Sequence, residues 1–164
     1  MSGWGQATVS GGASVSNVTL VSVNGTTPAF TALSGATISG ATINSGITLN
    51  ADPGVTFSGL ITDSGTLSGG TLASGAKLDA TTGSASDITV GKGATAFAQL
   101  GGDLRNTTVQ AGGTLQGGQA GGYSGNTVVS SGATVIGGEI RGNTVLSNGA
   151  SASELWMVSG GTLS

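Results

Sequence analysis

The residues of this chain that could do acid–base or metal chemistry are few. Seven carboxylates are spread over 164 residues, and the chain contains neither histidine nor cysteine. Without histidine it lacks the usual general base, the serine–histidine pair and the commonest zinc ligand. Without cysteine it forms neither a disulfide nor a thiolate metal site. We therefore expect no enzymatic activity, no cofactor and no bound metal ion.

Three of the carboxylates could still act together. Asp63, Asp79 and Asp87 would approach one another if the chain stacked on itself about every 18 residues. Two carboxylates at a defined separation are the catalytic groups of most glycoside hydrolases, so polysaccharide cleavage is one hypothesis. We favour the simpler interpretation that these are isolated aspartates in turns, where aspartate is common.

A glycine-rich segment at 117–126 is the next candidate for ion binding. It has the glycines of the calcium-binding nonapeptide repeat but lacks the aspartate of that repeat. A calcium site and a plain loop are both compatible with this pattern, and we favour the loop. No glycine cluster is followed by Gly-Lys-Ser or Gly-Lys-Thr, so the sequence does not indicate a phosphate-binding loop.

A short phrase that recurs along the chain indicates the elements that must position these side chains. An apolar residue is followed by two variable residues, then Gly, then Gly or Ala, a small polar residue and another apolar residue. The central glycines of the clearest series are evenly spaced: Gly75, Gly93, Gly112, Gly132 and Gly149. A nearly constant step of about 17–20 residues is typical of proteins built from stacked repeats.

The residues between these glycines favour short strands. Good helix formers such as Glu, Lys, Arg and Met are scarce, whereas Gly, Thr, Ser and Val dominate. Apolar residues alternate with small polar ones, as in Ala36-Thr37-Ile38 and Val55-Thr56-Phe57, which is the pattern of a strand with one buried face. The sequence therefore predicts an all-β fold: a single-stranded parallel β-solenoid (β-helix) with rungs of about 17–20 residues.

The repeats are not equally clear along the chain. We expect one domain, 1–164, with the clearest repeats at 66–164 and an irregular N-terminal part at 1–32. Between positions 33 and 49 the apolar residues step by 5 or 6 positions, which fits a narrow solenoid with three faces. Residues 16–32 fit neither spacing, so we expect a broader strand, a loop or a cap there.

One stretch of the repeats resembles a known family. The phrase Asn-Thr-Thr-Val-Gln-Ala-Gly-Gly-Thr-Leu at 106–115, with weaker copies at 126–135 and 143–152, resembles the strand-loop-strand repeat of self-associating adhesins, which are bacterial autotransporter passengers. That resemblance implies cell adhesion, biofilm formation and an extracellular or cell-surface location. In some members of the family, serine and threonine hydroxyls carry sugars. The chain starts without the early positive charge and apolar core of a signal peptide, so we expect no secretion signal in it.

Two sets of residues are candidates for contact with a partner. Asn106, Asn126 and Asn143 each precede a threonine-containing strand, and they would form a stripe along an outer face. An internal asparagine ladder that satisfies turn backbone explains the same spacing at least as well. Trp4 and Trp156 lie near opposite ends of the chain, where each could dock an exposed terminal rung. The alternative for these aromatic residues is core filling.

Charge narrows the choice of partner. A formal charge of −3 without a basic cluster disfavours nucleic acid and anionic lipid, and no apolar run is long enough for membrane insertion. The sequence thus predicts a non-enzymatic extracellular β-solenoid that acts as an adhesive, self-associating surface protein. Its partner would be itself, bound laterally or end to end, or a cell-surface glycan.

Two alternative functions follow from other features. Residues 1–76 carry only Asp52 and Asp63 as charged groups, and strand edges are usually protected by charge. This scarcity favours a secreted subunit that polymerises end to end into a filament, or a phage or appendage fibre. An ice-binding solenoid is the second alternative. It needs regular Thr-x-Thr on one face, and the spacing predicts only irregular threonine stripes.

Overall fold

The chain forms a rod of parallel β-strands. The computed structural model describes residues 6–22, 28–118 and 121–164, and no helix within them is long and apolar enough to cross a membrane. The nine-stranded sheet, called sheet A below, contains β1 (Ala7–Val9), β3 (Ala29–Ala32), β5 (Thr48–Ala51), β7 (Thr66–Ser68), β10 (Ser84–Ser86), β13 (Asp103–Arg105), β16 (Gly122–Ser124), β19 (Glu139–Ile140) and β22 (Trp156–Met157). The 14-stranded sheet, sheet B, contains β2 (Ser14–Leu20), β4 (Thr37–Ile43), β6 (Thr56–Asp63), β8 (Thr71–Leu72), β9 (Lys77–Ala80), β11 (Thr89–Val90), β12 (Thr95–Ala98), β14 (Thr108–Val109), β15 (Thr114–Gly117), β17 (Asn126–Val129), β18 (Thr134–Ile136), β20 (Asn143–Leu146), β21 (Ser151–Ser153) and β23 (Thr162–Leu163).

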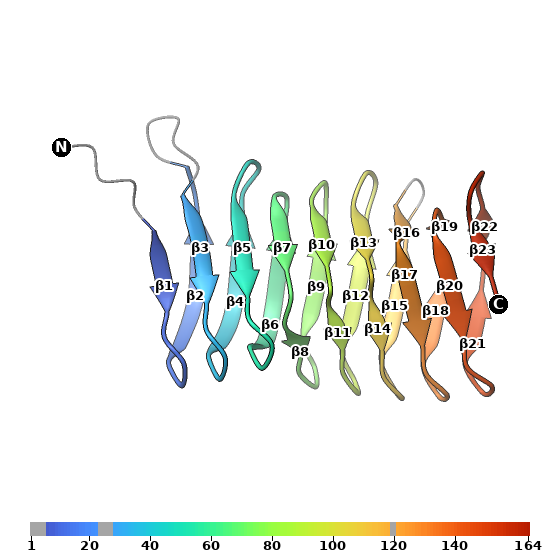
Figure 1. The fold of residues 1–164 in the computed structure, drawn as a ribbon, viewed down its shortest axis with the longest axis horizontal. Helices are drawn as coiled ribbons and strands as arrows, with labels where there is room; N and C mark the ends of the chain where they lie inside the picture. The colour runs from blue at the N-terminus through green and yellow to red at the C-terminus, as the bar shows by residue number, and fades with distance from the viewer. Residues whose placement is uncertain (1–5, 23–27, 119–120) are drawn as a thin grey trace.

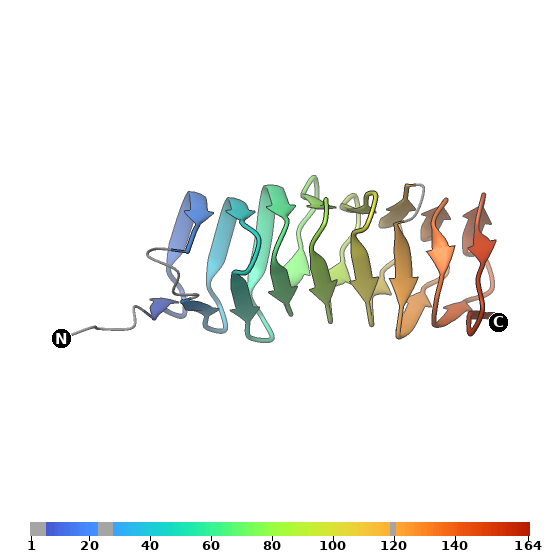
Figure 2. The same cartoon turned by 90° about the horizontal axis from the view of Figure 1, so that it is seen from above.

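Each lap of the coil, called a rung below, passes once through sheet A and then through sheet B. Each sheet A strand pairs in parallel with the strand one rung further on, so that Leu49 lies opposite Leu67, and Leu67 opposite Ala85. The nine strands of sheet A correspond to about eight rungs, which are stacked along the rod (Figure 1 and Figure 2). The predicted all-β parallel solenoid is confirmed.

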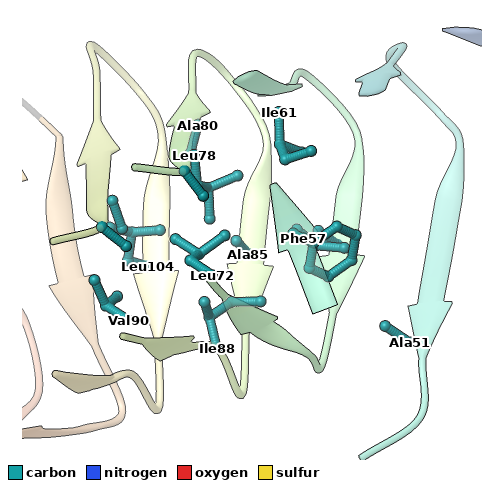
Figure 3. Packing of buried hydrophobic residues seen from close by; sticks show 14 of the residues in the cluster. Ala51, Phe57, Ile61, Leu72, Leu78, Ala80, Ala85, Ile88, Val90 and Leu104 are labelled. Atoms are coloured by element: carbon teal, nitrogen blue, oxygen red, sulfur yellow. The ribbon is translucent and has the colours of Figure 1, made fainter. Parts of the chain in front are cut away.

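The core is a thin axis filled by columns of inward-facing side chains. In sheet A one such column contains Leu49, Leu67, Ala85, Leu104, Tyr123 and Ile140, all buried. In sheet B, Phe57, Leu72 and Val90 stack in the same way and are fully buried. Figure 3 shows buried side chains from both sheets pointing into the space between them. Full burial of one such side chain is worth about 1.5–3 kcal/mol, so a single rung has too little core to be stable alone.

The recurring glycines stack at one corner of the solenoid. The Gly75 N–H donates to the carbonyl of Gly93 (3.1 Å), Gly93 to Gly112 (2.8 Å), Gly112 to Gly132 (2.9 Å) and Gly132 to Gly149 (3.0 Å). All five have a left-handed backbone, with φ between 74° and 87°, which glycine adopts without a steric cost. The recurring phrase in the sequence is therefore one tight turn repeated in register.

The rod has two regions, and they differ in how the chain passes through sheet B. In the N-terminal region (β1–β6), the sheet B strands are seven or eight residues long, and each bends at one left-handed residue: Asn17, Gly40 or Gly59. In the C-terminal region (β7–β23), the corresponding face consists of two short strands separated by the tight glycine turn. The N-terminal region places its own tight turns elsewhere, between sheet A and sheet B, at Gly12, Gly35 and Gly54.

Strand β6 joins the two regions by pairing with two strands at once. Its first half pairs with β8, where Phe57 lies opposite Leu72. Its second half pairs with β9, where Ile61 lies opposite Leu78. Residues 73–76 form the extra turn between β8 and β9. The two sheet B columns therefore continue unbroken although the shape of the rung changes.

The first rung is longer than the sequence predicts. Its pairing sets Ala7 opposite Phe30, whereas the rungs that follow keep the expected length, as where Phe30 lies opposite Leu49 and Leu49 opposite Leu67. The extra residues follow β2, in the 16–32 segment that fitted neither spacing. The broader strand expected there is β2, and residues 23–27 lie outside the described part of the chain.

Candidate functional site

The outer faces of the rod are the candidate functional surface, and one column of threonines runs along sheet B. Thr37, Thr56, Thr71, Thr89 and Thr108 lie opposite one another on five consecutive rungs, preceded by Ser14. The prediction of irregular threonine stripes is wrong for this face. Unequal spacing in the sequence hid the column, because the short step from Thr56 to Thr71 crosses the change of rung shape at β6.

The column is a single residue wide over most of its length. Ser39 and Ser58 accompany it two positions further along β4 and β6, but Ala73, Gly91 and Gln110 follow in the C-terminal region. Beyond Thr108 the column continues with Val128 and Val145, which keep the branched shape but have no hydroxyl. The hydroxyl row is thus continuous along the first part of the rod and ends in the second.

Sheet A carries a second set of polar columns on its outer face. Thr48, Thr66 and Ser84 lie opposite one another, and Asn50, Ser68 and Ser86 form the next outward column. Further along, the same columns become charged. Asp103 pairs with Arg105 (2.7 Å) and Glu139 with Arg141 (2.7 Å), each pair separated by one residue in the sequence. Alternate residues of a strand share a face, so both pairs lie on the outside.

The three candidate asparagines occupy two different columns. Asn126 lies opposite Asn143 at the start of β17 and β20, and both are exposed. The Asn143 side-chain oxygen accepts a hydrogen bond from the Thr162 hydroxyl (2.9 Å). Asn106 sits at a corner in the left-handed conformation. Its side-chain oxygen accepts from the Asn126 backbone N–H (3.0 Å) and its amide donates to Asp87 (3.3 Å).

These contacts distinguish the two explanations of the asparagine spacing. Asn106 satisfies the backbone of the next rung, as the asparagine-ladder interpretation expects. Asn126 and Asn143 form a short exposed row. Their use as an interaction surface stays a prediction.

The end-docking tryptophans are placed only in part. Trp4 lies outside the described residues. Trp156 is 51% exposed and lies opposite Glu139 on the outer face of sheet A. The residues that continue the buried columns on the last rung are instead Met157 and Leu163, which are 52% and 44% exposed. The alternation along the strand could have identified Met157, because it follows Trp156 directly and must face the other way.

The three carboxylates that could have acted together point in different directions. Asp63 faces the core, Asp79 lies on the outer face of β9, and Asp87 is at an exposed corner in the left-handed conformation. Among the described residues there is no group of three carboxylates that could hold a metal ion. The structure thus does not bring a catalytic carboxylate pair together from this set.

Asp63 is the unusual carboxylate of the described chain. It is fully buried in the column between Ile43 and Ala80. One of its oxygens accepts a hydrogen bond from the Gly65 N–H (2.9 Å), and the other has no partner. Burial raises the pKa of this carboxyl from 3.8 to about 6, although the bond from Gly65 opposes the shift. The environment therefore favours the uncharged form of Asp63.

The glycine-rich segment makes room for a buried aromatic ring. Tyr123 is 1% exposed in the core column between Leu104 and Ile140, and its hydroxyl donates to the Gly137 carbonyl (2.9 Å). A Cβ atom on Gly117, in that segment, would lie 3.0 Å from the Tyr123 hydroxyl oxygen, and one on Gly138 of the next rung would lie 3.0 Å from the ring. Burial raises the pKa of the Tyr123 phenol. These glycines therefore have a packing role.

A groove with both polar and apolar residues on the outside of sheet B was not found from the sequence. It follows β9, β12 and β15 and is lined mainly by Leu60, Lys77, Asp79, Phe97 and Gln116. Leu60 also belongs to a second groove beside the bend of the N-terminal strands. Leu60 shares its outward column with Lys77, and Phe97 shares its own with Asp79 and Gln116. Without the register these residues could not be placed on one face.

Comparisons with known proteins give little information about the function of this surface. No family model matches the chain, and no curated protein sequence matches it. Among solved structures it is similar to the crystal structure of a fragment of TibA, covering residues 55–350 of that protein and hyper-glycosylated in a reaction catalysed by TibC. The similarity spans 96% of this chain and 90% of that chain, with 18% sequence identity and a TM-score of 0.26. A similarity this weak says nothing about what the present chain binds.

Proposed function

We propose that this protein is a non-enzymatic adhesive rod, exposed outside the cell, that associates laterally with a second copy of itself. The observation that carries the proposal is the threonine column from Thr37 to Thr108, which places one outward hydroxyl on each of five successive rungs. Each hydrogen bond between two such rods contributes about 0.5–1.5 kcal/mol net. Useful affinity then comes from repetition along the rod.

The distribution of charge supports lateral contact on the first part of the rod. Up to residue 76 the chain carries two charged groups, Asp52 and Asp63, and Asp63 is buried. Over Thr37, Thr56 and Thr71, two copies can therefore bring their hydroxyl columns together without desolvating many charges, which is a large cost at interfaces. The dispersed carboxylates support the non-enzymatic part of the proposal. The extracellular location is part of the same proposal, because homotypic adhesion requires exposure to another cell.

Lysine substitutions in the threonine column test the proposal. The triple variant Thr56→Lys, Thr71→Lys and Thr89→Lys places three positive charges in one row. We expect the wild type to associate as its concentration rises in sedimentation velocity, and this variant to remain monomeric. Circular dichroism tests whether the variant is still folded.

The matched control places the same three charges on another face of the solenoid. Thr114→Lys, Thr134→Lys and Ser151→Lys alter the outward column of β15, β18 and β21, and we expect this variant to associate like the wild type. The proposal fails if the wild type stays monomeric at all concentrations, or if both triple variants associate as the wild type does.

End-to-end assembly is a second candidate, because both ends of the described rod expose apolar side chains. The last rung presents Met157 and Leu163. At the other end, the first two rungs line a cavity of about 160 Å³ with apolar residues that include Val9, Val15 and Phe30. A second copy stacked in register would cover both surfaces. Electron microscopy separates the candidates, since lateral adhesion predicts discrete or bundled rods and end-to-end assembly predicts long fibres.

A further inference from the structure

We propose that the groove on the outer face of β9, β12 and β15 binds a neutral linear glycan that runs along the axis of the rod. This inference concerns a face of sheet B other than the threonine column, and it does not depend on self-association. Two adjacent outward columns form the groove. The first contains Leu60, Lys77, Thr95 and Thr114, and the second contains Thr62, Asp79, Phe97 and Gln116.

The register shows that these side chains face outward. Between the two columns runs the inward column of Ile61, Leu78, Ala96 and Leu115, which is fully buried. Neighbours of a buried strand residue point to the opposite face of the sheet. The groove between the outward columns is shallow, with a volume of about 260 Å³, and Leu60 connects it to a second hollow of about 320 Å³ beside the strand bends.

Leu60 and Phe97 make this part of the surface unusual. Leu60 is 54% exposed, and Phe97 is a half-buried ring at an outward position. Elsewhere, the outward columns of the first five rungs consist mostly of serine and threonine. The exposed part of the Phe97 ring offers an apolar platform, and Leu60 adds an aliphatic side chain two strands away in the same groove. The C–H face of a pyranose ring is the part of a sugar that packs against such a platform.

Polar groups of both kinds surround that platform. The Gln99 side-chain amide donates to both oxygens of Asp79 (2.7 Å each) and so fixes the orientation of the carboxylate. A carboxylate has about four acceptor positions, so Asp79 can still accept hydrogen bonds from sugar hydroxyls. Lys77 adds donors, and Gln116 adds one donor group and one acceptor. Sugar hydroxyls both donate and accept, and this set can satisfy both.

The same features disfavour other classes of ligand. An extended peptide would add to a free strand edge, but β9 pairs with both β6 and β12, and β12 pairs with both β9 and β15. Nucleic acid and acidic polysaccharide need a cluster of basic residues, whereas Lys77 has an acidic neighbour in Asp79. The nearly balanced charge of the groove favours a neutral chain.

The geometry of the solenoid favours a chain over a single sugar. Stacked strands lie about 4.8 Å apart, so the four rungs from β6 to β15 extend the groove over roughly 14 Å. The polar positions recur at each rung along the axis. A linear glycan laid along this direction would therefore meet similar groups at regular intervals, and several weak contacts would add together.

Isothermal titration calorimetry with neutral hexasaccharides tests the inference on the whole chain. The probes are cellohexaose, maltohexaose, laminarihexaose and xylohexaose, and we expect at least one to bind. For that probe, Phe97→Ala should weaken the affinity by about fivefold to tenfold, the usual size of an aromatic contact. Ile136→Ala is the matched control, because Ile136 occupies the same outward column beyond Gln116, and it should leave the affinity unchanged.

Three outcomes would overturn the inference: no probe binds, binding persists unchanged in Phe97→Ala, or Ile136→Ala weakens it equally. A second variant, Gln99→Ala, releases the Asp79 carboxylate and should weaken binding while Asp79 itself remains. Sedimentation of Phe97→Ala distinguishes this inference from the proposed function, since we expect self-association to be unchanged while glycan binding is lost.

Discussion

The N-terminal and C-terminal regions of the rod solve the same problem in two ways. Both must carry the chain around a corner of sheet B while keeping the inward columns in line. The N-terminal region does so with one left-handed residue inside a long strand, as at Gly40 and Gly59, and the C-terminal region with a complete tight turn, as at Gly93 and Gly112. The comparison shows that the core columns, and not the positions of the loops, define this solenoid.

The regions also differ in what they present to solvent. The N-terminal region has outward hydroxyls and almost no charge, whereas the C-terminal region carries two ion pairs, an exposed asparagine pair and the mixed groove around Phe97. The two regions therefore differ both in the turn that they use in sheet B and in the charge of their outer surface. The predictions below test how far the two regions depend on one another.

The largest expected effect comes from the strand shared by both regions. Phe57 is fully buried on β6, between Ile38 of one region and Leu72 of the other. Phe57→Ala should lower the free energy of unfolding by about 3–5 kcal/mol, because it leaves a cavity where the regions meet. Urea denaturation measures the loss. Phe97→Ala removes a ring from the outer face and should cost no more than about 1 kcal/mol; similar losses in the two variants would contradict the core assignment.

A second effect concerns the buried carboxyl at the end of β6. Its folded-state pKa is raised from 3.8 to about 6, so the folded protein binds this proton more tightly than the unfolded chain does. The stabilisation is complete below about pH 3.8 and is lost as the pH rises through about 6. Acidification from pH 7 to pH 4 should therefore raise the contribution of Asp63 to stability by about 2–3 kcal/mol.

Urea denaturation across this pH range, compared between variants, isolates that contribution. Asp63→Asn should flatten the profile between pH 4 and pH 7, because the amide does not titrate. Asp52→Asn is the control, since Asp52 is exposed in a turn of the same region, and it should keep the wild-type profile. An unchanged profile in Asp63→Asn would show that the carboxyl is not desolvated in the folded protein.

A smaller effect distinguishes the two kinds of corner. Gly59 has φ of 67°, and Asn17 holds the equivalent bend two rungs earlier with φ of 52°. A Cβ atom on Gly59 would meet nothing closer than 3.4 Å, so the cost is conformational. Gly59→Asn should change the stability by less than about 0.5 kcal/mol, whereas Gly59→Val should cost about 1–2 kcal/mol. Thermal denaturation compares them, and equal losses would contradict the assignment of this bend.

The smallest effect is expected from the ion pairs that distinguish the C-terminal surface. Arg105 is more than half exposed in its pair with Asp103. Arg105→Ala should change the free energy of unfolding by less than about 1 kcal/mol, and added salt should reduce the difference further. A larger, salt-independent loss in urea denaturation would mean that these charges stabilise the rod rather than only shape its surface.

The strand period and the glycine step were sufficient to predict the fold. The stacked glycines from Gly75 to Gly149 share one corner because only that register lets each apolar residue of the phrase face the core. The outward columns were harder to predict. At Asn106 the left-handed residue interrupts the alternation, so Arg105 and Asn106 both face outward and Thr107 is buried. Alternation counted forward from β13 therefore places Thr107 on the outer face, although it is buried.

The candidate surfaces needed the pairing register, which the sequence does not contain. The threonine column crosses β6 with a step that differs from its neighbours, and Phe97 joins Asp79 only when β12 is aligned with β9. The apolar residues of the last rung were overlooked for a simpler reason. Trp156 was predicted to dock the terminal rung because it is large and aromatic, whereas Met157 and Leu163 occupy the inward positions.

The double pairing of β6 also limits how such a rod can become longer or shorter. Within either region, a whole lap can be copied or deleted, because its neighbours have the same outline and the cut ends meet in register. A duplication that includes β6 is different. It would place a C-terminal type of rung before an N-terminal type of rung, and the chain would then need another strand that pairs with two strands at once. Duplications and deletions of rungs should therefore accumulate on either side of β6, and β6 itself should stay present in one copy.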